Sequence, residues 1–296
     1  MADLWRGGGH GGARAFAGLF VVLWATGFVG ARYGLPYAES ATLLTLRFGA
    51  AAAMLGLLAL ALGARWPRSL AEVGHQSVVG VTLQVGYIAG VYAAIEHGVS
   101  AGVAALVVGL QPLLTALVVG RWFGERVGPR QWLGLLLGLA GVALVVRDKI
   151  AVGEGTPYAF ALAVGALVAI TFATLYQKRF CAAADLVSGT AVQYGAATLV
   201  IAPIAAVFES LAIRWTTTFV LTLAWIVVVL SVGSVVMLFV LIRRGQAARV
   251  ASLFYLVPPV TALMGWALFG ETLSWPALVG MALAVAGVAL VNTGRG

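Results

Sequence analysis

Neutral polar side chains interrupt several long apolar runs of this sequence, and their types suit the binding of a small solute. Gln84, Tyr87 and Tyr92 lie on one broad face at helical spacing within a single run. Amide, hydroxyl and aromatic groups suit a small zwitterion with an apolar or aromatic side chain, and suit a phosphorylated solute poorly. For each candidate, a packing contact is the competing interpretation. The candidate binding residues are Trp24, Gln84, Tyr87, Tyr92, Gln111, Gln177, Ser234 and Tyr255.

Arg47 is the one basic residue that falls well within an apolar run. Its guanidinium could bind a substrate carboxylate, or it could be satisfied by backbone carbonyls or an ion pair. No Asp or Glu falls in the middle of any run. Because proton-coupled pumps commonly use a carboxylate there, its absence favours facilitated diffusion or exchange.

The sequence predicts no catalytic residue, metal site or cofactor. His10, His75 and His97 lie far apart in the chain, and Cys181 is the single cysteine. Neither an HExxH motif nor a Gly-rich phosphate loop is present. The net charge of +8 comes from basic residues at the ends of apolar runs, so it does not indicate nucleic-acid binding. We therefore expect a protein that is not an enzyme.

The composition predicts an all-α integral membrane protein that crosses the bilayer many times. The chain is 62% hydrophobic and 9% charged, far from the balance of soluble domains. Its apolar runs are long enough for helices that cross a hydrocarbon core of about 30 Å, and they lack the alternation of barrel strands. The ten expected spans are 15–33, 38–62, 73–95, 99–122, 130–147, 157–177, 185–207, 218–242, 247–269 and 275–292.

The chain contains an internal repeat with an offset of 146 residues. "PLLTAL" at 112 aligns with "PPVTAL" at 258, and Phe-Gly-Glu at 123 aligns with Phe-Gly-Glu at 269. The repeat divides the chain into 1–146 and 147–296, with five expected spans in each. Since five is odd, the second half must be inverted relative to the first, and the substrate site is expected near the midplane between the two halves.

The distribution of basic residues orients the chain. Arg121, Arg126 and Arg130 have uncharged counterparts in the second half, as expected if the two hairpins face opposite sides of the membrane. Counting all short loops places both termini in the cytoplasm. Glu125 and Glu271 recur in both hairpins, and we expect each to offer its carboxylate to the N–H groups of a nearby helix start.

Prolines and glycines interrupt the expected spans at corresponding places. Pro112 and Pro258 align in the repeat, which predicts hinges or gating elements beside the substrate site; a static kink is the competing interpretation. Gly-x-x-x-Gly at 134 and 138, with Gly280 and Gly287, predicts close helix approach, for which a homodimer is one use.

The paired "PLLTALVVGRWFGE" and "PPVTALMGWALFGE", "LWATGF" at 23–28 and "LRF" at 46–48 resemble the EamA-type transporters of the drug/metabolite transporter superfamily. In overall appearance the chain is most similar to the YddG-type exporters of aromatic amino acids. The resemblance implies a ten-helix transporter of the bacterial inner membrane, with a central cavity between its halves.

We therefore expect an exporter of small neutral or aromatic amino acids that works by alternating access and facilitated diffusion. Its partners would be the small solute and the lipid bilayer. An exporter of amphiphilic cations or other metabolites, through cation–π contacts, is the alternative, together with a metabolite exchanger. A channel suits a duplicated inverted fold less well.

Overall fold

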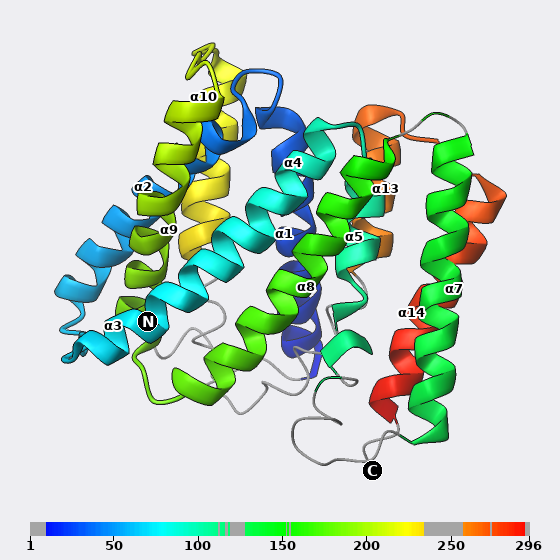
Figure 1. Ribbon diagram of the computed structural model, residues 1–296, viewed down its shortest axis with the longest axis horizontal. Helices are drawn as coiled ribbons and strands as arrows, with labels where there is room; N and C mark the ends of the chain where they lie inside the picture. Colours follow the sequence, from blue (N-terminus) through cyan, green and yellow to red (C-terminus); the bar gives the residue numbers. More distant parts are fainter. Residues whose placement is uncertain are drawn as a thin grey trace.

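The computed structural model describes a helical protein, with no strand among residues 10–111, 113–115, 118, 128–151, 153, 155–233, 257–272 and 274–293 (Figure 1). The prediction of an all-helical chain is confirmed for these residues. The expected positions Pro112, Ser234 and Tyr255 lie outside them. The helices are α1 His10–Gly34, α2 Ser40–Ala61, α3 Leu70–Gly80, η2 Val81–Ala89, α4 Gly90–Glu96, α5 Ala101–Val108, α7 Pro129–Ala151, α8 Pro157–Phe180, α9 Leu186–Phe208, α10 Thr217–Ala224, η3 Trp225–Gly233, α13 Val257–Phe269 and α14 Trp275–Thr293.

Four helices are long and apolar enough to cross a membrane, namely α2, the continuous helix Leu70–Glu96, α8 and α9. The bounds of α2 and α9 lie within two residues of the expected spans 38–62 and 185–207. Shorter apolar helices include Thr217–Gly233 and Val257–Phe269. The apolar runs thus form helices where the sequence predicts them, as the bilayer requires of a spanning backbone.

Side-chain caps fix where several helices begin. The Asp185 carboxylate accepts hydrogen bonds from the backbone N–H groups of Val187 and Ser188 at the start of α9. Thr156 accepts from the N–H of Ala159 at the start of α8, and Pro157 follows it at a position that needs no N–H donor. These caps satisfy N–H groups that the helix itself leaves unpaired.

Two segments differ from the regular α-helix that the apolar runs predict. η2 and η3 are π-helical, and each is nine residues long. η2 lies inside the helix Leu70–Glu96, and η3 continues α10. Within η3 the Ser231 hydroxyl donates to the carbonyl of Ile226, five residues earlier, at 3.0 Å. π-Helical turns are rare and occur frequently at functional sites.

The helices associate in pairs that join the first part of the chain to the second. α2 packs against α9, α5 against α13, and α7 against α14. Figure 1 shows α2, α3 and α9 toward one end of the molecule and α7 and α14 at the other, with α1, α4, α5 and α8 between them. α7 and α14 approach so closely that a Cβ atom at Gly141 or Gly280 would overlap the backbone of the opposite helix. These glycines therefore serve packing within one chain.

The buried positions of α2 and α9 follow the 146-residue offset. Nine buried residues of α2, from Ala41 to Ala59, have buried counterparts 146 residues later, from Val187 to Ala205. Arg47 and Gln193 are one of these matched pairs. The two helices therefore present the same positions to the interior of the molecule.

Candidate functional site

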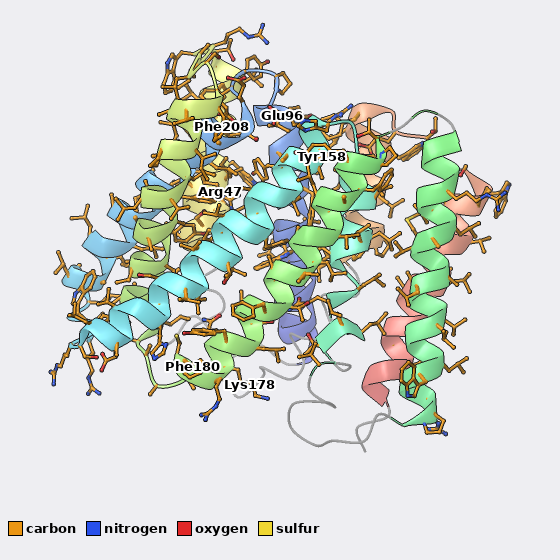
Figure 2. All side chains as sticks on the ribbon, in the orientation of Figure 1. Arg47, Glu96, Tyr158, Lys178, Phe180 and Phe208 are labelled. Atoms are coloured by element: carbon orange, nitrogen blue, oxygen red, sulfur yellow. The ribbon has the colours of Figure 1, made fainter. Side chains whose placement is uncertain are left out.

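Arg47 is the centre of the candidate site. It lies in the eighth position of α2, with its side chain only 5% exposed. Its Nε donates to the hydroxyl of Ser231 and its Nη1 to the hydroxyl of Tyr92, both at 3.1 Å. The guanidinium carbon also lies 5.9 Å from the centre of the Tyr92 ring. Three segments, α2, α4 and η3, thus meet at one guanidinium (Figure 2).

No acidic residue is described in contact with Arg47. Among the described residues it is the only charged one that is buried. The acidic residues Glu39, Glu72, Glu96, Asp185, Glu209 and Glu271 lie in connections or at helix ends of the part of the chain that the structure describes. A guanidinium carries five N–H donors, and hydroxyl groups accept from two of its nitrogens here. The remaining donors suit an anionic ligand.

The expected residues Gln84 and Tyr87 also lie in the interior. Gln84 is 4% exposed and its Oε1 has no hydrogen-bond partner, which distinguishes it from the other buried polar atoms of the described residues. Tyr87 is 7% exposed and lies within electrostatic range of Arg47. Gln84 lies in η2 and Tyr92 in α4, so both belong to the continuous helix Leu70–Glu96. An unpaired buried acceptor is costly, so Oε1 of Gln84 is a candidate partner for a ligand or a bound water.

The serine that contacts Arg47 lies in a π-helical segment. Ser231 of η3 accepts from Nε of Arg47, whereas Ser234 lies outside the described residues. A π turn takes more residues than an α turn, so it changes which side chains face the interior beyond it. Ser231 is not among the candidates selected from the sequence, because an α-helical register gave no reason to prefer it.

Gln111, Trp24 and Pro258 lie near the interior but do not contact Arg47 in any described interaction. The Gln111 amide donates to the hydroxyl of Thr174 at 3.1 Å and so joins the end of α5 to α8. Trp24 is partly buried against the core. Pro258 is buried in α13, and a Cβ atom at Gly109 would lie 2.9 Å from its Cγ. Pro258, the predicted hinge residue, thus packs closely against the end of α5.

Gln177 lies away from this group. It is partly exposed and precedes Lys178, which Figure 2 places at the lower end of the molecule, whereas Arg47 lies at mid-height. The described structure therefore brings Arg47 and Tyr92 into direct contact, with Tyr87 within electrostatic range, and leaves Gln177 near one surface.

A second polar pair, which the sequence interpretation missed, occupies the position related to Arg47 by the repeat. Gln193 donates through Nε2 to Oε1 of Gln76 at 2.7 Å, and both side chains are buried. Gly80 allows this contact, because a Cβ atom there would overlap the backbone of Gln193. The 146-residue offset was the available signal, since it aligns Gln193 with Arg47. The second half therefore carries a neutral, internally satisfied amide where the first half carries a cation.

At the surface opposite Lys178, glutamate carboxylates accept hydrogen bonds from backbone N–H groups of other segments. Glu209, which ends α9, accepts hydrogen bonds from the backbone N–H groups of Ala41 and Thr42 at 2.7 and 2.6 Å. Glu39, which precedes α2, accepts from Ser210 in return. Glu271 accepts from the N–H of Ala101 at 3.4 Å, so the described contact of this hairpin glutamate reaches α5.

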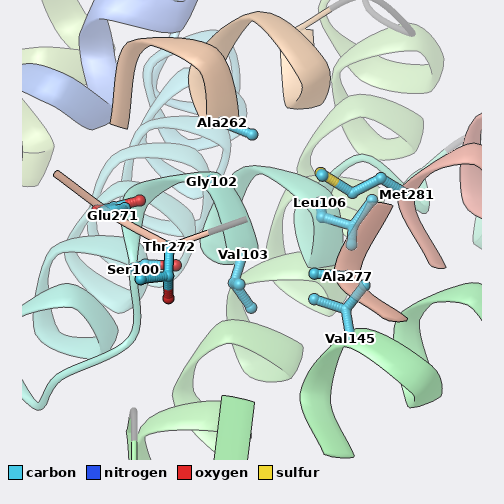
Figure 3. Close-up of a pocket in the computed structure, with 10 residues that line it drawn as sticks. All are labelled: Ser100, Gly102, Val103, Leu106, Val145, Ala262, Glu271, Thr272, Ala277 and Met281. Atoms are coloured by element: carbon cyan, nitrogen blue, oxygen red, sulfur yellow. The ribbon is translucent and has the colours of Figure 1, made fainter. Parts of the chain in front are cut away.

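The pocket beside Glu271 is too small for a solute of amino-acid size. Its volume is about 20 Å³, which is room for one water molecule. Figure 3 shows Glu271 and Thr272 on one side and apolar side chains such as Leu106 and Met281 on the other. Arg47 does not line this pocket. No group of three His, Cys, Asp or Glu side chains that could hold a metal occurs among the described residues.

Comparison with known proteins places these features in a family. The model of the EamA-like transporter family matches residues 14–147 and 157–293. An uncharacterized transporter, YvbV of Bacillus subtilis, is 31% identical over 65% of this chain, and the match spans 63% of that relative. An uncharacterized inner membrane transporter, YedA of Escherichia coli, is 26% identical over 95% of this chain and 91% of its own length.

A probable terminal-alkyne amino-acid exporter of Streptantibioticus cattleyicolor is 29% identical over 93% of this chain and 91% of its own length. A solved crystal structure with 20% sequence identity superimposes with a TM-score of 0.64, over 96% of this chain and 99% of that chain. The helical arrangement described above is therefore one already seen in a solved structure.

Proposed function

Because the chain belongs to the EamA-like transporter family, we propose that it exports small neutral and aromatic amino acids across a bacterial inner membrane. The protein is a membrane transporter, and proteins of this family are not enzymes. Its direct partners are a small-molecule solute and the surrounding lipid. Transport would proceed by alternating access, as facilitated diffusion, because no acidic residue falls in the middle of an expected span to couple proton movement.

The proposed architecture has ten membrane helices in two inverted halves, residues 1–146 and 147–296. Three observations support it. The two segments that match the family correspond to the two halves. The buried positions of α2 recur in α9 at the 146-residue offset. The π-helical segments η2 and η3 begin 144 residues apart, at Val81 and Trp225. Repeats of this kind place the substrate between the halves.

The proposed orientation has both termini in the cytoplasm. Lys178 and Arg179 lie near the lower surface in Figure 2, with Arg65 and Arg68 in the neighbouring α2–α3 connection. Glu96 lies near the opposite surface. Cytoplasmic loops collect Lys and Arg, so the surface at Lys178 is the cytoplasmic one in this proposal. Glu209 and Glu271 then face the periplasm.

The proposed substrate class depends on one observation: the guanidinium of Arg47 is buried, and no acidic residue is described in contact with it. Arginine binds carboxylates through two parallel hydrogen bonds, and the bond strengthens away from water. Tyr92, Tyr87 and Trp24 offer aromatic surface for an apolar side chain, and Gln84 offers an unpaired acceptor. The amino-acid exporter among the relatives is consistent with this class of solute. The proposed lining also includes Gln111, Gln177, Ser234 and Tyr255, with hinges at Pro112 and Pro258.

Export of amphiphilic cations is the second candidate, since aromatic rings bind cations. The buried positive charge of Arg47 argues against it, because a cation in the same interior would be repelled and would lack an acidic partner. Exchange of two metabolites remains compatible with the same site. It differs from facilitated diffusion in requiring a solute on the opposite side of the membrane.

The test is efflux from proteoliposomes loaded with labelled phenylalanine, leucine, alanine or lysine, without an ion gradient. We expect saturable efflux of the neutral amino acids and loss of at least ten-fold in rate for Arg47→Gln. Arg32→Gln is the matched control, because Arg32 is exposed at the end of α1. Equal efflux from the Arg47 and Arg32 variants would exclude Arg47 as the carboxylate site. Efflux that requires an external amino acid would identify an exchanger.

A further inference from the structure

We propose that the same site binds and carries monocarboxylic acids that lack an amino group, and that it rejects dicarboxylic acids. This inference rests on the proposed amino-acid export, because it assigns the Arg47 subsite to the carboxylate of the solute. It extends the substrate class beyond amino acids. Three features favour this class of solute: the cation at Arg47, the lack of an acid near it among the described residues, and the neutral amide at the related position.

The carboxylate is the group that the site is built to recognise. Ser231 and Tyr92 accept from Nε and Nη1 of Arg47 and so hold the plane of the guanidinium. This leaves the Nη2 edge with no described protein acceptor. N–H groups along one planar edge of a guanidinium can donate in parallel to the two oxygens of one carboxylate. Any small acid whose side chain fits the aromatic surroundings would therefore satisfy the main charge requirement of the site.

The amino group of an amino acid finds no acidic partner among the groups described near Arg47. These groups are hydroxyls and an aromatic ring, Gln84 of the same proposed lining offers only a neutral amide oxygen, and no acidic residue falls in the middle of an expected span. Removing an ammonium from water without an acidic partner is unfavourable. Replacing the ammonium by a hydroxyl removes that penalty and leaves the contact with Arg47 intact. A 2-hydroxy acid should therefore bind at least as well as the matching amino acid.

A second carboxylate would be excluded for the same electrostatic reason. The position related to Arg47 by the repeat is Gln193, whose amide is buried and paired with Gln76 at 2.7 Å. Arg47 is the only buried charged residue of the described chain. A solute with two carboxylates would therefore leave one of them desolvated and without a cation.

Four compounds that share a benzyl group separate these charge requirements. They are phenylalanine, 3-phenyllactate with a hydroxyl in place of the amino group, phenylalaninol without the carboxylate, and benzylsuccinate with two carboxylates. Each is tested as a competitor of labelled phenylalanine entry into proteoliposomes, and 3-phenyllactate is also preloaded inside to test acceleration of that entry. Protein-free liposomes report passive leakage. Binding is measured independently as a change in Tm of the purified protein in detergent.

We expect 3-phenyllactate to compete within three-fold of phenylalanine and to accelerate entry from the inside. Phenylalaninol and benzylsuccinate should compete at least ten-fold more weakly. Arg47→Gln should remove the preference for the acid over the amine. Arg47→Lys keeps the positive charge but loses the planar set of N–H donors, so it should retain the preference at lower affinity. Both variants are compared only as monodisperse protein.

The outcomes separate this inference from the proposed function. If phenylalanine is carried through Arg47 but 3-phenyllactate is ten-fold weaker, or if benzylsuccinate competes equally well, the inference is wrong and amino-acid export stands. If 3-phenyllactate is carried and no amino acid is, the inference stands and amino-acid export is wrong. If neither compound binds or moves, both are wrong.

Discussion

Replacing Gly80 by alanine tests whether the contact between α3 and α9 is as close as the structure describes. A Cβ atom at Gly80 would lie 2.5 Å from the Cα and 2.7 Å from the carbonyl carbon of Gln193. Backbone atoms cannot move aside as the end of a long side chain can. The helices must therefore separate, which also strains the hydrogen bond between Gln193 and Gln76.

The expected destabilisation follows from three terms. Overpacking a core typically costs about 1–3 kcal/mol. Weakening a buried hydrogen bond adds roughly 1 kcal/mol or more. Replacing glycine by alanine within a helix stabilises the folded state by about 0.5–1 kcal/mol, which offsets part of this loss. The net change is a loss of about 1–4 kcal/mol, which corresponds to a decrease in Tm of roughly 2–6 °C for a chain of this size.

The assay is thermal unfolding of the purified protein in detergent, followed by intrinsic fluorescence. Gly56→Ala is the matched control on α2, because a Cβ atom at Gly56 meets nothing within 4 Å. We expect Gly56→Ala to leave Tm unchanged or raise it, and Gly80→Ala to lower it. A Tm for Gly80→Ala equal to or above that of the wild type would refute the close approach of α3 to α9.

Three further predictions concern other parts of the molecule. Glu209→Ala should lower Tm, since a lost helix cap costs about 0.5–2 kcal/mol and three hydrogen bonds from Ala41 and Thr42 disappear; the exposed Glu96→Ala is the control, and equal Tm values would contradict the capping role. Gln84→Leu should keep or raise Tm, because Oε1 of Gln84 is buried without a partner, yet it should slow amino-acid efflux; a clear fall in Tm would show that Gln84 has a structural role instead. Burial raises the pKa of the Cys181 thiol, which follows α8, so at a given pH less thiolate is present and maleimide labelling should be slower than for a free cysteine until the chain is denatured; equally fast labelling before and after denaturation would be contrary to this expectation.

The bounds of several helices could be predicted because apolar runs end abruptly at polar or helix-breaking residues. α9 begins after Asp185, which caps it, and ends before Glu209. Arg47 and Tyr92 could likewise be selected as interior residues, because a charge or hydroxyl within an apolar run must face protein rather than lipid.

Other features depend on contacts between distant segments and so had no local signal. The π-helical register of η3, which presents Ser231 to Arg47, does not follow from apolar content. The pairing of Gln193 with Gln76 required knowing that α3 lies against α9. The repeat contained part of this information, because it aligns Gln193 with Arg47, but only the folded chain shows that the two positions have different partners.

The reciprocal hydrogen bonds that Glu39 and Glu209 form between the start of α2 and the end of α9 have a consequence for how the protein is made. The first N–H groups of α2 are satisfied by a residue that lies 168 and 167 positions later in the chain. During synthesis, α2 is therefore inserted long before its partner carboxylate exists, and its amino-terminal end must rely on water or lipid head groups until α9 is complete. A first half produced alone would keep that unfinished end, so the two halves should be obtained as stable protein only when they are produced together.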